Sequence, residues 1–250
     1  MEIIKQITRA GNSSNVLLPK EWLGGTARVE LIEKPLSIKE DIFEILNPYL
    51  KNALGIYLAG SYARKEETKD SDVDILVITD GINKRIKKGR YEIILISKTE
   101  LDKTLKRNAI PLLPMIKEAK TILNEGLMGG YKKIKLNKEN TKSILEITKS
   151  SRNVCGESIK ISKQLGENAS DEIMYSLILG LRTIYIIDSL KRNKIPTTKG
   201  LKNLIIKLTN SEEPYNAYLR VKNDKKTKSV ISVEIAEKLN CYLIEKLGKL

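Results

Sequence analysis

The segment "LAGSYARKEETKDSDVDILVIT", residues 58–79, combines the pattern of a buried strand with two acidic residues that interrupt it. An apolar run ends at Gly60-Ser61, a polar loop follows, and Asp72 and Asp74 then precede the apolar run "ILVIT". Residues i and i+2 of a strand point to the same face. We therefore expect the two carboxylates to project side by side, while the residues that alternate with them face the core.

Two ionised carboxylates at this spacing repel each other unless a cation lies between them or they share a proton, and Mg²⁺ or Mn²⁺ prefers such oxygen ligands. The alternative is that Asp72 and Asp74 lie on an exposed edge strand and only keep it soluble. The preceding Gly60 and Ser61 favour the metal, because Gly60 lets a phosphate approach the backbone, and Ser61 and the free amides of a following helix can bind it. A phosphate site beside a metal site indicates phosphoryl or nucleotidyl transfer.

Composition limits the chemistry of the 250-residue chain. It has no His, which removes His-based general bases and most zinc sites, and its two Cys residues are far apart, as in a reduced cytoplasmic protein. Neither a secretory signal nor a membrane span is expected. The formal net charge is +14, of which +11 falls in residues 129–250. This excess either attracts an anionic partner or simply solvates the surface of a Lys-rich protein.

Three regions differ in their patterns and predict an α+β protein. Residues 1–34 alternate apolar and polar residues between turn-rich segments, which predicts a small β module that cannot bury a core alone. Residues 35–128 interleave strands and helices, which predicts an α/β domain with a short mixed sheet. Residues 129–250 predict a helical bundle, with helices near 139–166, 170–193, 197–209, 212–223 and 229–247. We expect the glycine-containing segment "GLMGGYKKIKLN", residues 126–137, to form a hinge or linker between the last two regions.

The order Gly-Ser, about ten residues, then Asp-x-Asp resembles the signature of the DNA polymerase beta nucleotidyltransferase superfamily, in particular the small prokaryotic and aminoglycoside nucleotidyltransferases. The resemblance covers roughly residues 36–125. It implies that Gly60 and Ser61 hold the nucleotide phosphates and that Asp72 and Asp74 bind Mg²⁺. A third carboxylate normally comes from an adjacent strand, and "GRYEIILIS" offers Glu92 either as a third ligand or as the general base for an acceptor hydroxyl.

One position departs from this family pattern. In many relatives a Gly follows the Ala-Arg pair, at the position that Lys65 occupies after Arg64 in this chain. Arg64 and Lys65 are candidates for contact with a triphosphate, with surface solvation as the alternative. The departure affects no metal ligand, but it leaves the conformation of the loop open.

The two flanking regions have resemblances of their own. Residues 1–34, with "GNS", "LPKEW" and "ARVEL", resemble the swapped-hairpin module of AbrB- and MazE-like regulators, which implies a dimer of interleaved copies. Arg9, Lys20 and Arg28 are the candidates for DNA binding, but the module's net charge of only +1 favours dimerisation.

The helical half resembles the bundle that follows the catalytic domain in aminoglycoside nucleotidyltransferases and HEPN-type proteins, chiefly in "LILGLRTIYIIDSLKRNKIPTTKGL". HEPN ribonucleases need an Arg followed by a His, so the absence of His excludes that activity. Arg182 lies in a strongly apolar stretch, where an unpaired charge is costly. We expect it either to pair with an acid or to point into a cleft toward the nucleotide or the acceptor.

The sequence therefore predicts a cytoplasmic, homodimeric, metal-dependent nucleotidyltransferase of EC 2.7.7 type. The expected reaction moves NMP from an NTP, with ATP the expected donor, to an acceptor hydroxyl and releases pyrophosphate. A small molecule, an RNA end and a protein Tyr remain open as acceptors. The alternative is a DNA-binding regulator or antitoxin in which the N-terminal module provides the main function.

Overall fold

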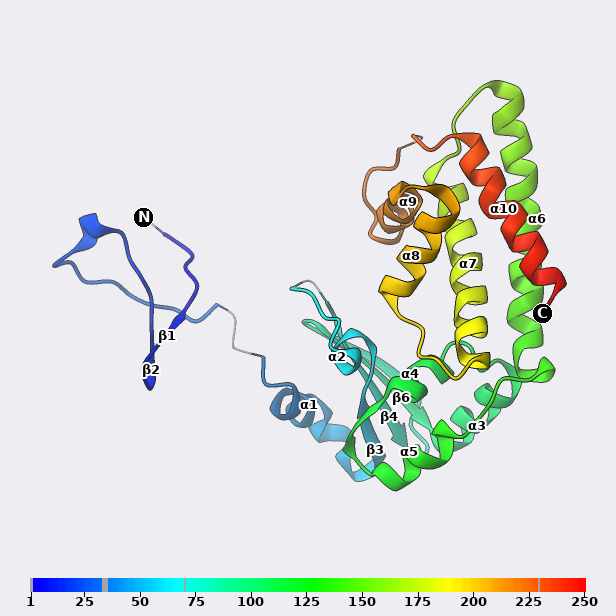
Figure 1. Cartoon of the computed structure of the whole chain (residues 1–250). Helices are drawn as coiled ribbons and strands as arrows, with labels where there is room; N and C mark the ends of the chain where they lie inside the picture. The colour runs from blue at the N-terminus through cyan, green and yellow to red at the C-terminus, as the bar shows by residue number, and fades with distance from the viewer. Residues whose placement is uncertain (1, 33–35, 70, 229) are drawn as a thin grey trace. The chain divides into compact units, whose positions relative to one another are not determined.

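A computed structural model of the chain describes residues 2–32, 36–69, 71–228 and 230–250 (Figure 1). It divides the chain into two compact units, Met1–Ser37 and Ile38–Leu250. The predicted boundary at residue 34 lies outside the described residues. The predicted boundary at residue 128 separates no compact unit and stays a prediction.

The first unit contains a short antiparallel hairpin of β1 (Thr8–Ala10) and β2 (Ser13–Asn15), followed by the 3₁₀ helix η1 (Lys20–Trp22). The segment "ARVEL" was expected to form a further strand, but its residues are irregular. No described residue of this unit is buried, and its large apolar side chains are exposed. A strand without a neighbour leaves its backbone unpaired. The hairpin alone offers too little surface to hold another strand.

The second unit is built around one mixed sheet of five strands. In chain order these are β3 (Ala53–Leu58), β4 (Val73–Thr79), β5 (Lys84–Lys88), β6 (Tyr91–Ser97) and β7 (Lys120–Leu123). Their order in the sheet is β5-β6-β4-β3-β7, with β4 and β6 parallel and the other neighbours antiparallel. The mixed sheet confirms the prediction. The sequence did not reveal β5, "KRIKK", because its four cations mask the strand pattern; such charges are typical of edge strands.

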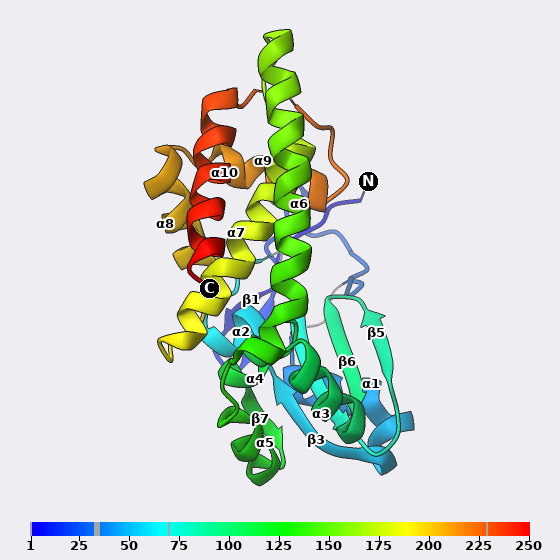
Figure 2. The same ribbon diagram turned by 90° about the vertical axis from the view of Figure 1, so that its right-hand side faces the viewer.

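Helices cover both faces of this sheet (Figures 1 and 2). On one face, α1 (Ile38–Leu46), which continues into the 3₁₀ helix η2 (Asn47–Asn52), buries Ile42 and Leu46 against β4. On the other face lie α3 (Lys98–Arg107), α4 (Leu113–Glu118) and α5 (Glu125–Lys132). Each fully buried Ile or Leu side chain contributes about 1.5–3 kcal/mol to folding. The strand that carries the acidic pair is therefore held firmly between two apolar layers.

The segment 126–137 is not the hinge that its glycines predicted. Its first half forms α5, in which Met128 and Tyr131 are buried in the hydrophobic cluster of the sheet, α3 and α4, and the Tyr131 hydroxyl donates to Asp102 Oδ1 at 2.8 Å. Asn124 caps the helix by accepting a hydrogen bond from the Leu127 amide at 3.1 Å. Burial of these apolar residues at helical spacing outweighs the cost of about 1 kcal/mol for each glycine in a helix.

The remaining helices form the predicted bundle. They are α6 (Lys138–Leu165), α7 (Asp171–Lys191), α8 (Thr198–Thr209), α9 (Glu213–Lys222) and α10 (Val233–Gly248). The bounds agree with the sequence prediction within two residues, except that α10 begins at residue 233 rather than 229. Both cysteines are free; Cys155 is buried as expected, whereas Cys241 is exposed.

Helix α7 is the central helix of the bundle and packs against α6, α9 and α10. By length and composition alone it is apolar enough to cross a membrane, and 44% of its most apolar window is buried. Packing in the bundle core accounts for this apolar character. Near its end, Leu190 joins the hydrophobic cluster of the sheet and α3–α5, and the Ala109 amide donates to the Asn140 carbonyl at 2.9 Å. The bundle and the α/β half thus share one packed junction.

A buried carboxylate at the start of α7 holds the other end of the bundle together. Asp171 is fully buried and accepts hydrogen bonds from Arg220 Nε at 2.7 Å and Nη2 at 2.9 Å. It also accepts one from the Lys228 amide at 2.8 Å, which fixes the loop before α10. The Arg220 hydrogen bonds, together with that amide, hold the pKa of Asp171 below its ordinary value despite burial.

Asp171→Asn should lower the free energy of unfolding at pH 7 by about 3 kcal/mol, because it leaves buried donors without their charge partner. A lowered pKa means that ionised Asp171 stabilises the fold above its unfolded value of about 3.9 and loses this effect as pH falls through the folded pKa. Urea unfolding should therefore show the variant and the wild type converging below about pH 4. Glu157→Gln, which removes an exposed ion pair with Lys160, is the control and should change little. A pH-independent deficit for Asp171→Asn would contradict this account.

Candidate active site

The turn between β3 and α2 (Gly60–Arg64) is fixed by the close approach of two segments. Gly60 has φ +65°, and a Cβ there would lie 1.9 Å from Asp74 Oδ2. Only glycine combines this conformation with this contact at low cost. Ala59 is the N-cap of α2, so Ser61 lies inside the first turn of the helix.

The acidic pair lies as the sequence predicted. Asp72 directly precedes β4 and Asp74 is its second residue, whereas Val73 and Ile75 are buried in the cluster under α1. Asp74 faces the opposite side of the sheet, the side that α3–α5 cover farther along the strand.

The structure also brings Glu92 to this place. Because β4 and β6 are parallel and in register, Asp74 is paired directly with Glu92. Paired residues of neighbouring strands point to the same face. The Glu92 carboxylate is bound by Lys87 on the edge strand β5, with Lys87 Nζ donating to Oε1 at 3.0 Å. The three predicted carboxylates therefore lie where the interior strands β4 and β6 begin, beside the Gly60 turn.

One carboxylate of this site was missed by the sequence analysis. Glu118, at the end of α4, has a side chain only 5% exposed, and its Oε1 accepts from the Gly60 amide at 2.7 Å. Its Oε2 accepts from Arg64 Nη1 at 2.5 Å. The one clue in the sequence is a single acid in the apolar segment "LPMIKEA", which has no motif spacing to Gly60. Glu118 therefore accepts the hydrogen bond of the Gly60 amide, which the sequence motif predicted to bind a phosphate.

The electrostatics of the site favour a cation. Burial, with smaller contributions from Glu92, Asp72 and Glu118, raises the pKa of Asp74 to about 6, and Arg64 only partly offsets these effects. Negative charge is thus gathered around Asp74 without full compensation. Among the residues that the structure describes, no three Cys, Asp or Glu side chains form a complete metal site. Hard carboxylate donors on neighbouring strands nevertheless fit a divalent ion that completes its shell with phosphate oxygens and water.

The other predicted site residues lie in different surroundings. Arg64 is bound by Glu66 at 2.9 Å as well as by Glu118, which keeps its guanidinium in place along α2. Lys65 is exposed and adopts the left-handed conformation, φ +59°, which glycine adopts most readily.

Arg182 has no acidic partner among the described residues. It is exposed on α7, and Nη1 lies 3.5 Å from the Tyr218 hydroxyl on α9. Of the two alternatives for Arg182, the structure therefore does not show the pairing with an acid among the described residues. No described interaction links Arg182 with the carboxylates of the sheet, so its contact with a nucleotide or acceptor stays a prediction.

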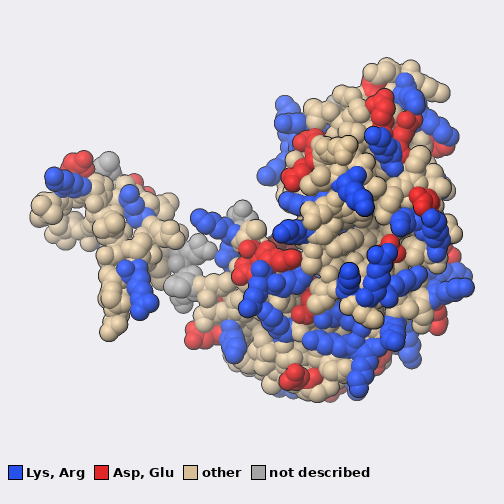
Figure 3. Space-filling view, in the orientation of Figure 1, with Lys and Arg blue, Asp and Glu red and all other residues tan. Residues whose placement is uncertain are grey.

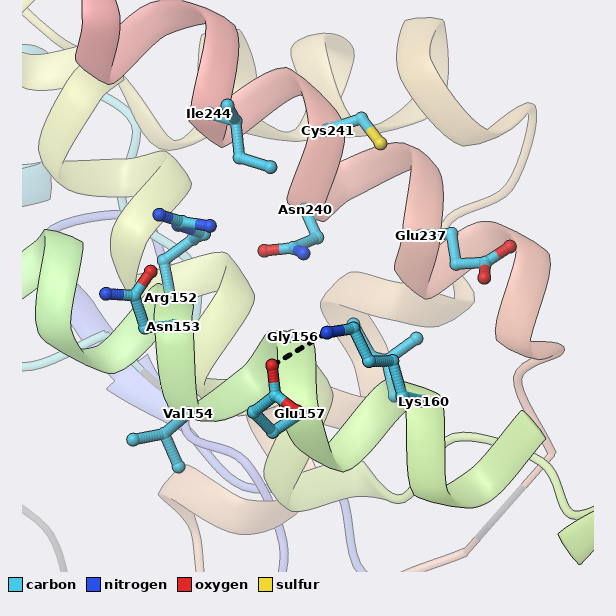
Figure 4. Close-up of a pocket in the computed structure, with 11 residues that line it drawn as sticks. Arg152, Asn153, Val154, Gly156, Glu157, Lys160, Glu237, Asn240, Cys241 and Ile244 are labelled. Carbon is cyan, nitrogen blue, oxygen red and sulfur yellow. Dashed lines mark hydrogen bonds and ion pairs between the residues drawn. The ribbon is translucent and has the colours of Figure 1, made fainter. Parts of the chain in front are cut away.

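A separate hollow of about 640 Å³ lies between α6 and α10 (Figure 4). Arg152 and Asn240 line it, together with the ion pair between Glu157 and Lys160, drawn as a dashed line. None of the predicted catalytic residues contributes to it.

Comparison with known proteins supports the assignment of the α/β half to the nucleotidyltransferase superfamily. Residues 39–128 match the family described as "Nucleotidyltransferase domain", and this segment contains the Gly60 turn and all four carboxylates of the site. No curated protein sequence matches the chain.

Solved structures resemble the chain only distantly. A nucleotidyltransferase-like protein from Exiguobacterium sibiricum is 14% identical with a TM-score of 0.39, covering 84% of this chain and 73% of that one. Spectinomycin adenyltransferase AAD(9) from Enterococcus faecialis, solved with ATP and spectinomycin, is 16% identical with a TM-score of 0.45, covering 84% and 97%. A toxin-antitoxin structure with AMP-PNP is 14% identical with a TM-score of 0.27, covering 49% and 98%. At these scores the site has to be interpreted from its own geometry.

Gly60→Ala should destabilise the protein by about 1–3 kcal/mol, because alanine is strained at positive φ and its methyl group meets the Asp74 carboxylate. Urea unfolding measures this loss. Gly129→Ala is the matched control, since Gly129 lies in α5 with open space around it and should be neutral or slightly stabilising. Combining Gly60→Ala with Asp74→Ala should recover the steric part of the loss. Equal losses in the single and double variants would show that the two residues are not in contact.

Proposed function

We propose that the protein is a metal-dependent nucleotidyltransferase that moves NMP from an NTP, with ATP the expected donor, to an acceptor hydroxyl. The observation that carries the proposal is that Asp72, Asp74 and Glu92 lie where β4 and β6 begin, beside the Gly60 turn. The match of residues 39–128 to the nucleotidyltransferase domain family supports it.

The residues take the following roles in this proposal. Asp72 and Asp74 hold Mg²⁺ or Mn²⁺, which when bound neutralises phosphate charge and acidifies the attacking hydroxyl. Glu92 is either a third ligand or the base that takes the acceptor's proton; as a base it must first leave Lys87. The acceptor oxygen bonds to the α-phosphorus, the bond to the bridging oxygen breaks, and pyrophosphate leaves with its electron pair.

The proposed phosphate contacts differ from those that the Gly60-Ser61 motif alone implies. Glu118 satisfies the Gly60 amide, so Gly60 contributes its conformation and its lack of a side chain. Ser61 and the exposed Lys65 are then the proposed phosphate contacts on this turn. Arg64, held by Glu66 and Glu118, stabilises the turn.

Two free thiols agree with a cytoplasmic location.

Labelled ATP with Mg²⁺ and a cell extract should label an acceptor when the wild-type protein is added. Asp72→Asn and Asp74→Asn should each lower the initial rate at least about 100-fold, because a lost metal ligand removes several kcal/mol of transition-state stabilisation. Asp80→Asn is the control, since Asp80 is an exposed acid just beyond the other end of β4. Full labelling by Asp74→Asn, or no labelling with any of the four NTPs, would refute the proposal.

The N-terminal unit supports a second part of the proposal, the homodimer. Eight large apolar side chains within residues 1–34 are exposed, which a second copy would bury: Ile4, Ile7, Leu17, Leu18, Leu23, Val29, Leu31 and Ile32. We propose that two copies of residues 1–34 pair in this way. DNA binding through Arg9, Lys20 and Arg28 is the alternative use of the unit.

Light scattering after size-exclusion chromatography should give a dimer for the full chain and a monomer after deletion of residues 1–37. Leu17→Asp with Leu31→Asp should have the same effect, because charges at a buried interface are costly. Lys5→Asp, an exposed charge change in the same unit, is the control. A monomeric full chain that binds its own promoter DNA would favour the regulator instead.

A further inference from the structure

A group of cations lies where the bundle meets the α/β half. We call Lys106, Arg107, Lys117, Lys132, Lys133 and Lys135 the junction surface. Figure 3 shows Lys and Arg side chains gathered on this part of the molecule, where α3, α4 and the start of α6 meet. Residues 98–142 carry 11 Lys and Arg against 5 Asp and Glu, a net charge of +6.

Described contacts place four of these cations in two pairs. Lys106 of α3 and Lys135 face the same hollow of about 360 Å³, which Asn137 and Asn140 also line. Lys117 donates to the Lys132 carbonyl, and Lys132 Nζ donates to the Ala119 carbonyl at 2.7 Å. The last two hydrogen bonds fix the ammonium groups of Lys117 and Lys132.

This charge is not neutralised within the described part of the chain. None of the six cations takes part in an ion pair there, although eight other Lys and Arg residues do. Two acids line the hollow beside these cations, Asp102, which accepts a hydrogen bond from the Tyr131 hydroxyl, and the exposed Glu139. Glu118, which follows Lys117, is bound by Arg64. Burial and the charge of Lys135 lower the pKa of Lys117. Like charges held together in this way destabilise a fold and are relieved by an anionic ligand.

We propose that the junction surface binds the phosphodiester backbone of a nucleic acid. Several cations without an acidic partner, with side-chain amides beside two of them, suit repeated phosphates better than a single small anion. Helix α4 carries both Lys117 of this surface and Glu118, which accepts a hydrogen bond from the Gly60 amide of the candidate active site. If the transfer reaction also holds, the acceptor hydroxyl belongs to the bound nucleic acid; this last step alone rests on the proposed function.

Fluorescence anisotropy of the full chain with a labelled single-stranded RNA, and with DNA of the same sequence, tests the proposal from 50 to 300 mM NaCl. The triple variant Lys106→Gln, Lys133→Gln, Lys135→Gln should bind at least about tenfold more weakly at 100 mM, with a slope of log K against log[salt] smaller by about 2. The matched control is Lys39→Gln, Lys51→Gln, Lys238→Gln, which changes the total charge equally at exposed residues elsewhere and should keep the wild-type slope.

Equal loss in both triple variants would show a non-specific charge effect and overturn the proposal, as would absence of binding at 50 mM. Displacement of the labelled strand by polyglutamate as readily as by unlabelled RNA would assign the surface to an acidic protein and overturn it too. The relative affinity for RNA and DNA identifies the kind of backbone. No nucleoside triphosphate is present, so the result does not depend on whether the transfer reaction occurs.

Discussion

The contact between the Gly60 turn and Asp74 is the constraint on which the site depends. It requires a residue without a side chain, in a left-handed conformation, at the point where β3 ends. The contact brings the start of α2 against Asp74 at the beginning of β4, so a phosphate held by the turn would lie beside the carboxylates. The same glycine lets Glu118 reach its amide, and that hydrogen bond ties α4 to the turn.

The buried charges around this contact hold the Gly60 turn and the residues beside it in one specific arrangement. Arg64 is shared between Glu66 and Glu118, and removal of either carboxylate would leave its guanidinium less satisfied in a half-buried position. Asp74 has no such partner, and burial among other acids raises its pKa. Among the described residues, Glu118 thus has an ion-pair partner, whereas the proposed metal ligand Asp74 has none. Helix α4 then links this site to the cations of the junction surface.

Much of this could be predicted from the sequence where local patterns decide the structure. The alternation of apolar and polar residues predicted that Asp74 and Val73 point to opposite faces of the sheet. Helical periodicity predicted the bounds of the bundle helices to within a few residues. Prediction failed where tertiary contacts decide. The glycines of α5 suggested a hinge because the burial of Met128 and Tyr131 against distant residues has no local signature. Glu118 was missed because its partner Gly60 lies 58 residues away, and β5 was missed because only its pairing with β6 reveals a strand of lysines.

A crystal structure with Mn²⁺ and a non-hydrolysable ATP analogue tests the central claim most directly. We predict an anomalous manganese peak about 2.1 Å from oxygens of both Asp72 and Asp74, with the analogue's phosphates on the Ser61 side of the ion. The orientation of Glu92, toward the ion or toward Lys87, would show whether it serves as a third ligand. A nucleotide bound elsewhere, or manganese with no contact to Asp74, would contradict the account.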